Sequence, residues 1–354
     1  MRIEIKDDIF NSNDFTNLTH LIRIVFQRPS KSINTKAKVF IDLDKCTNTV
    51  LYNRLDSIDR ELLEASTKEY FYESSPCINY IVSNNNSKES YNLEEAIELL
   101  KEPFWILLEN SKNDQEFIKS IIFHFEVDNE YLKECLKNRW IQFDNAGGCG
   151  NVKNLLTHRI NSFENLAVSQ GSLPRKYYRG MVILDSDREF STQSTKQDYE
   201  KLIEYFTKYN IPFHILEKRA MENYMPDEVL FDIQREKSNS KNPDDKKFVR
   251  WVNVYRHLSN MQKDFLKYDG LDSFEKLKPE VKNLYQNQVP SNFSLLVSGI
   301  SYRDHNALED DEKRFKNAFP KLFTQSPLVN KASLKARSGT DELDRIFNKI
   351  NQLL

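Results

Sequence analysis

Short apolar runs alternate with amphipathic segments through the middle of the chain. Each run is short enough for a buried strand, and the runs cover residues 104–108, 140–143, 180–184 and 212–216. The segments between them carry apolar side chains at helical spacing and cover residues 114–125, 151–164 and 196–209. Strands separated by helices of this length predict a parallel sheet with right-handed crossovers.

The pattern before this alternation is more irregular. Residues 17–27 are apolar and compatible with a helix or a strand, residues 38–43 indicate a strand, and residues 51–64 have helical spacing. Residues 83–90 are polar and predict a loop, after which Asn92 is placed to cap a helix that ends near residue 101. We therefore expect an N-terminal α+β region over residues 1–100.

The last part of the chain has mainly helical patterning. Residues 238–247 are polar and predict a mobile loop. Residues 343–354 form an amphipathic pattern that suits either core packing or a docking surface. The sequence thus predicts an α/β protein in three parts: the N-terminal region, a parallel sheet flanked by helices over residues 101–226, and a mainly helical region over residues 227–354.

Acidic residues and glycines follow three of the predicted strands. Glu109 ends the first apolar run, the glycine-rich segment 146–150 follows the second, and Asp185 and Asp187 follow the third. Parallel strands place their carboxyl ends at one edge of a sheet, where ligands bind in open α/β folds. We therefore expect these groups to converge. Residues two apart on an extended segment point to the same side, so Asp185 and Asp187 can reach one cation.

Composition limits the function classes. The chain has 51 Lys and Arg against 53 Asp and Glu, a formal net charge of -2, so any contact with nucleic acid must use a local basic face or metal ions. No apolar run approaches the roughly 18 residues of a membrane span, and the N-terminus lacks the apolar core of a signal peptide. We expect a cytoplasmic protein without membrane contact. The four cysteines show no metal-type spacing and are expected as reduced thiols: Cys46, Cys77, Cys135 and Cys149.

Converging oxygen ligands without a neighbouring Cys or His pair favour Mg²⁺ or Mn²⁺ over zinc. Such a site suits phosphoryl transfer or the hydrolysis of phosphodiesters. Three motifs then resemble a TOPRIM domain, in this order: Glu109-Asn-Ser-Lys-Asn-Asp114, Gly147-Gly-Cys-Gly150 and Asp185-Ser-Asp-Arg188. The resemblance is closer to the TOPRIM nucleases of overcoming-lysogenization-defect (OLD) proteins and of related anti-phage systems, including the effector nuclease of PARIS-type systems.

A further segment strengthens this resemblance. Residues 217–224, Glu-Lys-Arg-Ala-Met-Glu-Asn-Tyr, are similar to the segment that follows in a subgroup of these nucleases. The resemblance covers residues 103–226, about a third of the chain. One departure is Asn110, because TOPRIM proteins often have glycine after the first Glu.

The resemblance implies roles for eight residues. Metal ligands would be Glu109, Asp185, Asp187 and Glu222. Glu109 would alternatively act as a general base, and Asp114 would support the site or help to bind a second metal ion. Contacts to substrate phosphate would come from Arg188, Lys218 and Arg219. Structural alternatives remain open for three positions: Asp114 as a helix N-cap, Glu222 in an ordinary helix start beside a buried Tyr224, and Glu217 in a surface pair with Lys218 or Arg219.

The implied activity is that of a Mg²⁺-dependent endonuclease acting on DNA or RNA, tRNA included, as the toxic effector of an antiviral defence. The sequence has no Gly-x-x-x-x-Gly-Lys-Ser/Thr loop, so any ATPase in such a system, of the ABC or another P-loop type, would be a separate partner. A homodimer is a further possible assembly.

Two alternatives belong to other classes. The chain could be an interaction subunit of an ATPase-containing complex that keeps the TOPRIM fold without catalysis. Residues 40–47, Phe-Ile-Asp-Leu-Asp-Lys-Cys-Thr, are similar to the first motif of haloacid-dehalogenase-like phosphotransferases, with Asp42 as nucleophile and Asp44 as acid/base. The structural explanation of these two acids is a strand end and its turn.

Overall fold

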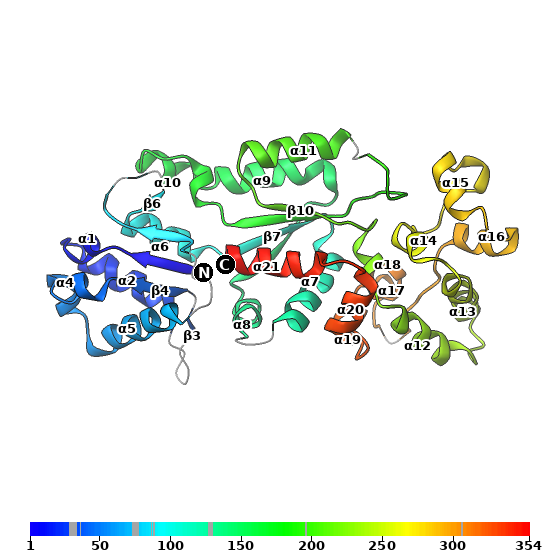
Figure 1. Ribbon diagram of the computed structural model, residues 1–354, viewed down its shortest axis with the longest axis horizontal. Helices are drawn as coiled ribbons and strands as arrows, with labels where there is room; N and C mark the ends of the chain where they lie inside the picture. Colours follow the sequence, from blue (N-terminus) through cyan, green and yellow to red (C-terminus); the bar gives the residue numbers. More distant parts are fainter. Residues whose placement is uncertain are drawn as a thin grey trace.

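The structure is a computed structural model that describes residues 1–27, 34–35, 37–72, 78–85, 87, 89–126, 130–194, 197–305 and 307–354. Two parallel sheets with flanking helices make it an α/β protein, as predicted. Figure 1 shows an elongated molecule with one sheet at the N-terminal end, the second in the middle and the helices of residues 227–338 toward the other end. None of the helices in these ranges combines the length and the apolar character that a membrane crossing needs.

The N-terminal region contains the first sheet, whose strand order is β4-β1-β5-β6 and whose paired strands are all parallel. Its strands are β1 (Arg2–Ile5), β4 (Lys38–Ile41), β5 (Tyr80–Val82) and β6 (Ser90–Tyr91). The prediction of an α+β region is therefore wrong in its sheet type. The reason is that β5 and β6 have only three and two residues, too few for a recognisable strand pattern.

Helices and a short antiparallel ribbon complete this region. They are α1 (Asp7–Phe10), α2 (Phe15–Val25), β2 (Phe26–Gln27), β3 (Asn34–Thr35), α3 (Leu43–Cys46), α4 (Val50–Arg54), α5 (Ser57–Phe71) and α6 (Leu93–Lys101). The ambiguous segment 17–27 is mainly helix α2. The single helix predicted over 51–64 is two helices, because the backbone of Leu55 is extended between them. Asn92 caps α6 as predicted, since its side chain accepts a hydrogen bond from the Glu95 N–H at 2.9 Å.

The central sheet has the order β10-β9-β7-β8, again with all paired strands parallel. Its strands match the four predicted ones: β7 (Phe104–Leu108), β8 (Ile141–Asn145), β9 (Gly180–Leu184) and β10 (Phe213–Ile215). The five residues of β9 are all buried, as expected for a strand covered by helices on both faces.

Helices cover both faces of the central sheet (Figure 1). One face carries α9 (Val152–Asn161) and α11 (Gln197–Lys208), while α10 (Glu164–Ser169) packs with Ala167 into the core of the first sheet. The other carries α7 (Ser111–Phe125), α8 (Tyr131–Lys137) and the C-terminal α21 (Glu342–Leu353). Short 3₁₀ turns join these elements: η1 (Cys149–Asn151), η2 (Pro174–Tyr177) and η3 (Met221–Tyr224).

The topology of the central sheet creates a crevice between β7 and β9. The chain leaves β7 toward β8 on one side and leaves β9 toward β10 on the other side. Adjacent strands whose connections diverge in this way form a topological switch point, and ligands bind outside the carboxyl ends of such strands. β7 and β9 are aligned so that Leu108 pairs with Ile183. The residues that follow these two strands therefore meet at the switch point.

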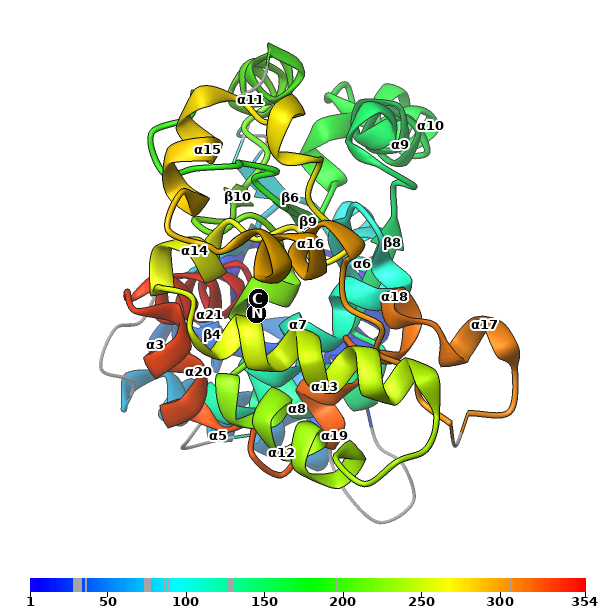
Figure 2. The same ribbon diagram turned by 90° about the vertical axis from the view of Figure 1, so that its right-hand side faces the viewer.

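The regular elements that the structure describes after η3 are helical. They are α12 (Asp227–Lys237), α13 (Pro243–Arg256), α14 (Asn260–Asp264), η4 (Phe274–Lys276), α15 (Pro279–Tyr285), α16 (Pro290–Ser298), α17 (Asp310–Lys313), α18 (Phe315–Ala318), α19 (Leu322–Gln325), α20 (Lys331–Ser338) and α21. Figure 2 shows α12 to α16 gathered at the end of the molecule that faces the viewer.

Two predictions for this region have different outcomes. The C-terminal helix packs into the core as one of the two alternatives stated, because Leu343, Ile346 and Ile350 are buried in the cluster that covers one face of the central sheet. The loop predicted over 238–247 is wrong in its second half, where α13 begins at Pro243. Asn242 caps this helix by accepting a hydrogen bond from the Asp244 N–H at 2.9 Å, a common start for a helix.

Candidate functional site

The structure brings all five predicted acids to the wall of one cavity of about 270 Å³. We call it the acidic cavity. Asp269 is a sixth acid in the lining, and the five predicted acids are Glu109, Asp114, Asp185, Asp187 and Glu222. They come from the end of β7, the first turn of α7, the segment after β9 and the η3 turn. The cavity therefore lies at the switch point of the central sheet, and segments far apart in sequence supply its carboxylates.

Backbone contacts hold two of these acids in place. Asp114 Oδ2 accepts a hydrogen bond from the Asn110 N–H at 3.0 Å, and Asp185 Oδ1 accepts one from the Met221 N–H at 3.1 Å. Asn110 is the N-cap residue of α7, so the alternative that Asp114 caps this helix is wrong. Asp114 lies one turn further and reaches back to the start of the helix. Each of these acids keeps a second oxygen for the cavity.

The glycine-rich segment makes a hydrogen bond to the backbone of Glu109. Gly147 and Gly148 have φ angles of 69° and 117°, which residues with a side chain rarely adopt. This turn lets the Gly148 N–H donate to the carbonyl oxygen of Glu109 at 3.1 Å. The glycines therefore fix the path of the chain just after β7, while the acids line the cavity.

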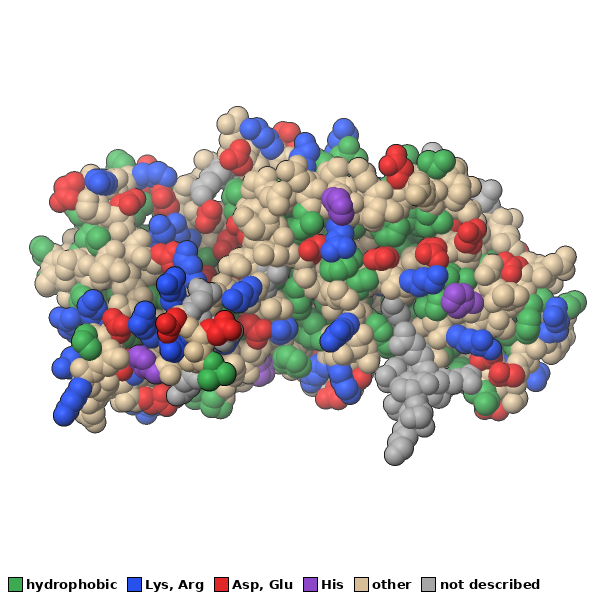
Figure 3. Space-filling model, turned by 180° about the vertical axis from the view of Figure 1, so that it is seen from behind, with side chains coloured by type: hydrophobic (Ala, Val, Ile, Leu, Met, Phe, Trp, Pro, Cys, Tyr) green, Lys and Arg blue, Asp and Glu red, His purple; other side chains and the backbone are tan. Residues whose placement is uncertain are grey.

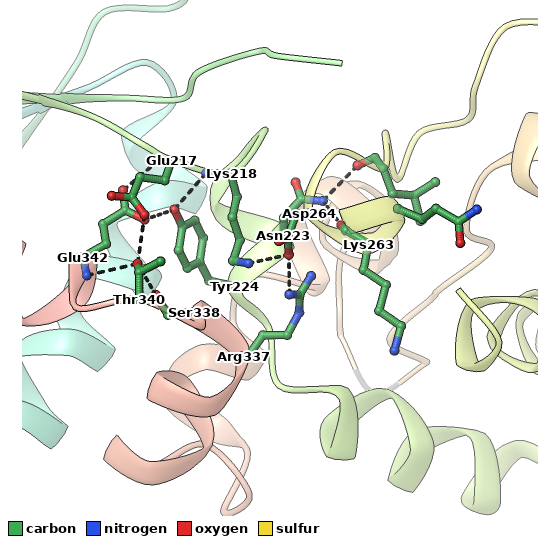
Figure 4. Close-up of polar contacts among 12 residues, drawn as sticks. Glu217, Lys218, Asn223, Tyr224, Lys263, Asp264, Arg337, Ser338, Thr340 and Glu342 are labelled. Atoms are coloured by element: carbon green, nitrogen blue, oxygen red, sulfur yellow. Dashed lines mark hydrogen bonds and ion pairs between the residues drawn. The ribbon is translucent and has the colours of Figure 1, made fainter. Parts of the chain in front are cut away.

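The segment 217–224 is clamped by residues of the C-terminal region (Figure 4). Asn223 is fully buried, and its amide donates to the carbonyl oxygens of Lys263 and Leu266 at 2.7 and 3.0 Å. Tyr224 is also fully buried and donates its hydroxyl to the carboxylate of Glu342. Glu222 therefore has a fixed backbone on one side and faces the cavity on the other.

Glu342 is a fully buried acid that is well satisfied. Its Oε1 accepts from the Glu217 N–H at 2.7 Å and is 2.8 Å from His214 Nε2, while its other oxygen accepts from Tyr224. Glu217 itself pairs with Arg345 and accepts from Thr340 Oγ1 at 2.8 Å. The alternative that Glu217 pairs with Lys218 or Arg219 is therefore wrong, since its partners are Arg345 and Thr340.

The three predicted phosphate contacts have different positions. Arg219 lines the acidic cavity. Lys218 is 4% exposed and pairs with Asp264, which also pairs with Arg337 at 2.6 Å, so its ammonium group is committed to a buried ion pair (Figure 4). Arg188 donates to the carbonyl oxygens of Ser191 and Glu217 and is not among the residues that line the cavity. The structure thus brings one of the three cations to the acids.

Burial and the repulsion between charged groups raise the pKa of three of these acids. Burial, with smaller contributions from the carboxylates of Glu222 and Glu109, raises the pKa of Asp114 to about 8. Burial together with the four other acids raises the pKa of Asp185 well above its ordinary value. The pKa of Glu222 is also raised, mainly by burial. These groups resist being charged together, and a cation among them would reverse that preference.

The donor set of the acidic cavity fits a hard divalent cation. The oxygen atoms are carboxylates, with Asn110 and Asn113 as neutral neighbours. Within the described ranges, no three or more His, Cys, Asp or Glu side chains are already arranged to hold a metal ion. Mg²⁺ commonly binds one or two carboxylates and completes its shell with water and substrate phosphate, so it does not require a complete protein cage.

Sequence reasoning missed several residues at this site. The Tyr199 hydroxyl donates to Glu109 Oε1 at 2.8 Å, although its position on α11 predicted only an apolar role. The C-terminal region adds Lys267, Asp269 and Lys316 to the lining, with Lys316 and Asp269 paired at 3.1 Å. No motif marks these three positions, because they reach the cavity through tertiary packing.

The rival acids of the first sheet lie in a different environment. Asp42 follows β4 and caps α3, accepting from the Lys45 N–H at 3.4 Å and pairing with the Lys45 ammonium at 3.0 Å. Asp44 is exposed in the first turn of α3. This environment is the one expected for a strand end and its turn. Among the cysteines, Cys46, Cys135 and Cys149 have free thiols, and Cys77 lies outside the described residues.

Comparisons of this chain with protein-family models, with curated proteins and with solved structures find no match. The functional interpretation therefore depends on the geometry and chemistry of the acidic cavity.

Proposed function

We propose that this protein is a metal-dependent nuclease of the TOPRIM type that uses Mg²⁺ or Mn²⁺ to hydrolyse phosphodiester bonds of DNA or RNA. One observation carries the proposal: five acids from distant segments line one cavity at the switch point of a parallel sheet. The order of the sequence motifs supports the TOPRIM assignment. The raised pKa values of Asp114, Asp185 and Glu222 support a cation as the missing partner.

Asp185, Asp187, Glu109 and Glu222 would hold the cation, which when bound stabilises negative charge on the attacking and leaving oxygens of a phosphodiester. Glu109 has a second assignment as the general base that takes a proton from the attacking water. The hydrogen bond from Tyr199 orients its carboxylate for either task.

Two further residues have supporting roles in this proposal. Arg219 lies at the same cavity and can contact a non-bridging phosphate oxygen of the substrate. Asp114 keeps the first turn of α7 in place through its contact with Asn110 and adds negative charge beside the cation. The resemblance to anti-phage nucleases adds a biological role as a toxic effector, with an ATPase as a separate partner.

Cleavage by the purified protein tests the proposal. Supercoiled plasmid, single-stranded DNA and total cellular RNA, tRNA included, are incubated with the wild type in Mg²⁺, in Mn²⁺ and in EDTA. We expect cleavage that needs a divalent cation and is lost in Glu109→Gln, a variant that keeps the size of the side chain. The same nucleic acids are then isolated from cells that express each form. If neither the purified wild type nor the expressing cells show more cleavage than Glu109→Gln, the proposal is wrong.

A further inference from the structure

A second cavity, of about 120 Å³, adjoins the acidic cavity. We call it the cationic cavity. Arg219 and Lys267 line both cavities, so the two spaces share a wall. The charged residues that line the second cavity alone are Glu189, Asp272, Lys276 and Lys278. Most of its wall therefore comes from the helical region after η3, outside the part of the chain that resembles TOPRIM domains.

The charge of the second cavity is opposite to that of the first. Four of its lining residues are cationic and two are acidic. Lys278 is paired with Glu189 at 2.5 Å. In the described part of the chain, the side chains of Arg219, Lys267 and Lys276 make no hydrogen bond or ion pair with a protein group. Three positive charges are thus available to a ligand, directly beside a cavity lined by six carboxylates.

The two cavities share a segment that is firmly held. The Leu271 N–H donates to the Leu296 carbonyl at 3.1 Å, and the Ile300 N–H donates to the Tyr268 carbonyl at 2.9 Å. Gly270 has a φ of 117°, and a Cβ atom there would lie 2.3 Å from the carbonyl oxygen of Val297. Only glycine allows this close approach. Residues 267–271 are therefore fixed against the chain at 296–300, and Lys267 extends from a fixed backbone.

The size and charge of the second cavity suit a phosphate group. Pockets for drug-sized ligands have volumes of about 300–1,000 Å³, well above that of this space. Lys and Arg side chains are the usual protein contacts of nucleic-acid phosphates. Figure 3 shows Lys, Arg, Asp and Glu side chains interspersed over the face seen there. The protein has a net charge of -2, so a polyanion would be attracted by a local set of cations such as this one and not by the overall charge.

We propose that the cationic cavity binds a backbone phosphate of the same nucleic-acid strand whose neighbouring phosphodiester occupies the acidic cavity. Arg219 and Lys267 lie between the two phosphates, and Lys276 contacts only the second one. The substrate is accordingly a strand that continues beyond the cleaved bond, and not a single terminal phosphodiester. This inference rests on the proposed nuclease function and adds a position for the substrate.

Binding without cleavage tests the inference. Short single-stranded DNA and RNA oligonucleotides are titrated with the full-length protein in EDTA, by fluorescence anisotropy, over a series of salt concentrations. The test variant is Lys267→Ala/Lys276→Ala. Its matched control is Lys68→Ala/Lys101→Ala, which removes one lysine each from α5 and α6 beside the first sheet. Circular dichroism verifies that both variants fold.

We expect the test variant to bind several-fold more weakly and the control to bind as the wild type does. The slope of log K against log salt should become less steep by about 1.4, because each lost phosphate contact contributes about 0.7 for a single strand. Lys267→Arg/Lys276→Arg keeps both charges and should keep the slope.

Two failures are distinguishable. If the wild type binds and cleaves nucleic acid but Lys267→Ala/Lys276→Ala has the affinity and slope of the control, the inference is overturned and the proposed function stands. If the wild type neither binds nor cleaves any strand, the proposed function itself fails, and the inference fails with it. Glu109→Gln separates the two steps, because it should bind with the wild-type slope without cleaving.

Discussion

The first sheet and the central sheet have the same strand order but very different acids at their carboxyl edges. Numbered along the chain, both sheets have their strands in the order 2-1-3-4. In the first sheet, Asp8 Oδ2 accepts from Ser83 Oγ at 2.7 Å and from the Asn84 N–H at 2.8 Å, and Asp42 pairs with Lys45. In the central sheet, the corresponding acids line one cavity together, where burial and the neighbouring carboxylates raise the pKa of Asp185.

The difference shows that topology and an acid at a strand end do not suffice for a site. An acid that finds nearby N–H, hydroxyl or ammonium donors stabilises a turn or a helix start. An acid that is buried among other acids is stabilised in its charged form only by a cation, and such an environment is typical of functional sites. Replacement of single acids from either class therefore tests the difference between the two sheets.

The largest effect is expected when the proposed cation ligands of the central sheet are removed. Asp185→Asn and Asp187→Asn should each lower cleavage by about a thousandfold, since a bound cation contributes several kcal/mol to a transition state of this kind. Rates are measured on the substrate that the wild type cleaves best. Asp42→Asn/Asp44→Asn is the matched control and should cleave at the wild-type rate. Equal losses of cleavage in both double and single variants would show that the acids of the two sheets do not differ in function.

A large loss of stability is expected when Glu342 is replaced. This buried acid lies beside the central sheet, but protein groups donate hydrogen bonds to it, as they do to the acids of the first sheet. Glu342→Ala leaves His214, Tyr224 and the Glu217 N–H without their acceptor. The free energy of unfolding should fall by about 3–5 kcal/mol. Urea unfolding measures it, with Glu98→Ala, which removes a partly exposed carboxylate on α6, as the control. A loss as small as that of the control would show that this buried network contributes little.

The acidic cavity should give the metal-free protein an unusual pH dependence. Burial, together with the nearby carboxylate of Glu222, raises the pKa of Asp114 from 3.8 for a free side chain to about 8 in the folded chain. The folded chain keeps a proton that the unfolded chain releases, so this contribution makes the folded state less stable as pH rises from about 4 to 8.

Asp114→Asn removes this effect. In EDTA, the variant should be more stable than the wild type by about 1–3 kcal/mol near pH 8, where the wild type holds a buried charge, with little difference near pH 4. Urea unfolding at the two pH values measures the change. A variant that is less stable near pH 8 would mean that the contact of Asp114 with Asn110 outweighs the repulsion.

The smallest effect is expected at Asp42. Its pKa is lowered by the hydrogen bond from Lys45, so its contribution to stability is present above about pH 4 and is lost in more acidic solution, the opposite sign to Asp114. Asp42→Asn should slightly lower the thermal midpoint at neutral pH and leave cleavage unchanged. Differential scanning calorimetry at neutral and acidic pH detects the change. A rise in the midpoint at neutral pH would contradict the stabilising role of this acid.

Much of the central sheet was predictable because buried parallel strands are continuous apolar runs. β7 and β9 are recognisable in this way, and the shared edge of a parallel sheet then brings Glu109 and Asp185 together. The position of Lys218 was not predictable, because its burial depends on Asp264 and Arg337 of the C-terminal region. The position of Lys267 was also not predictable, since the contacts of Gly270 and Gly299 that fix its loop have no local sequence pattern.

The central claim is that the acids of the central sheet hold a divalent cation and those of the first sheet do not. Calorimetric titration of the metal-free protein with Mn²⁺ near pH 7, in buffers of different ionisation enthalpy, tests it most directly. The account predicts saturable binding with release of protons from the acidic cavity, lost in Asp185→Asn/Asp187→Asn and unchanged in Asp42→Asn/Asp44→Asn. Binding that persists unchanged in Asp185→Asn/Asp187→Asn, or no binding by the wild type, would contradict it.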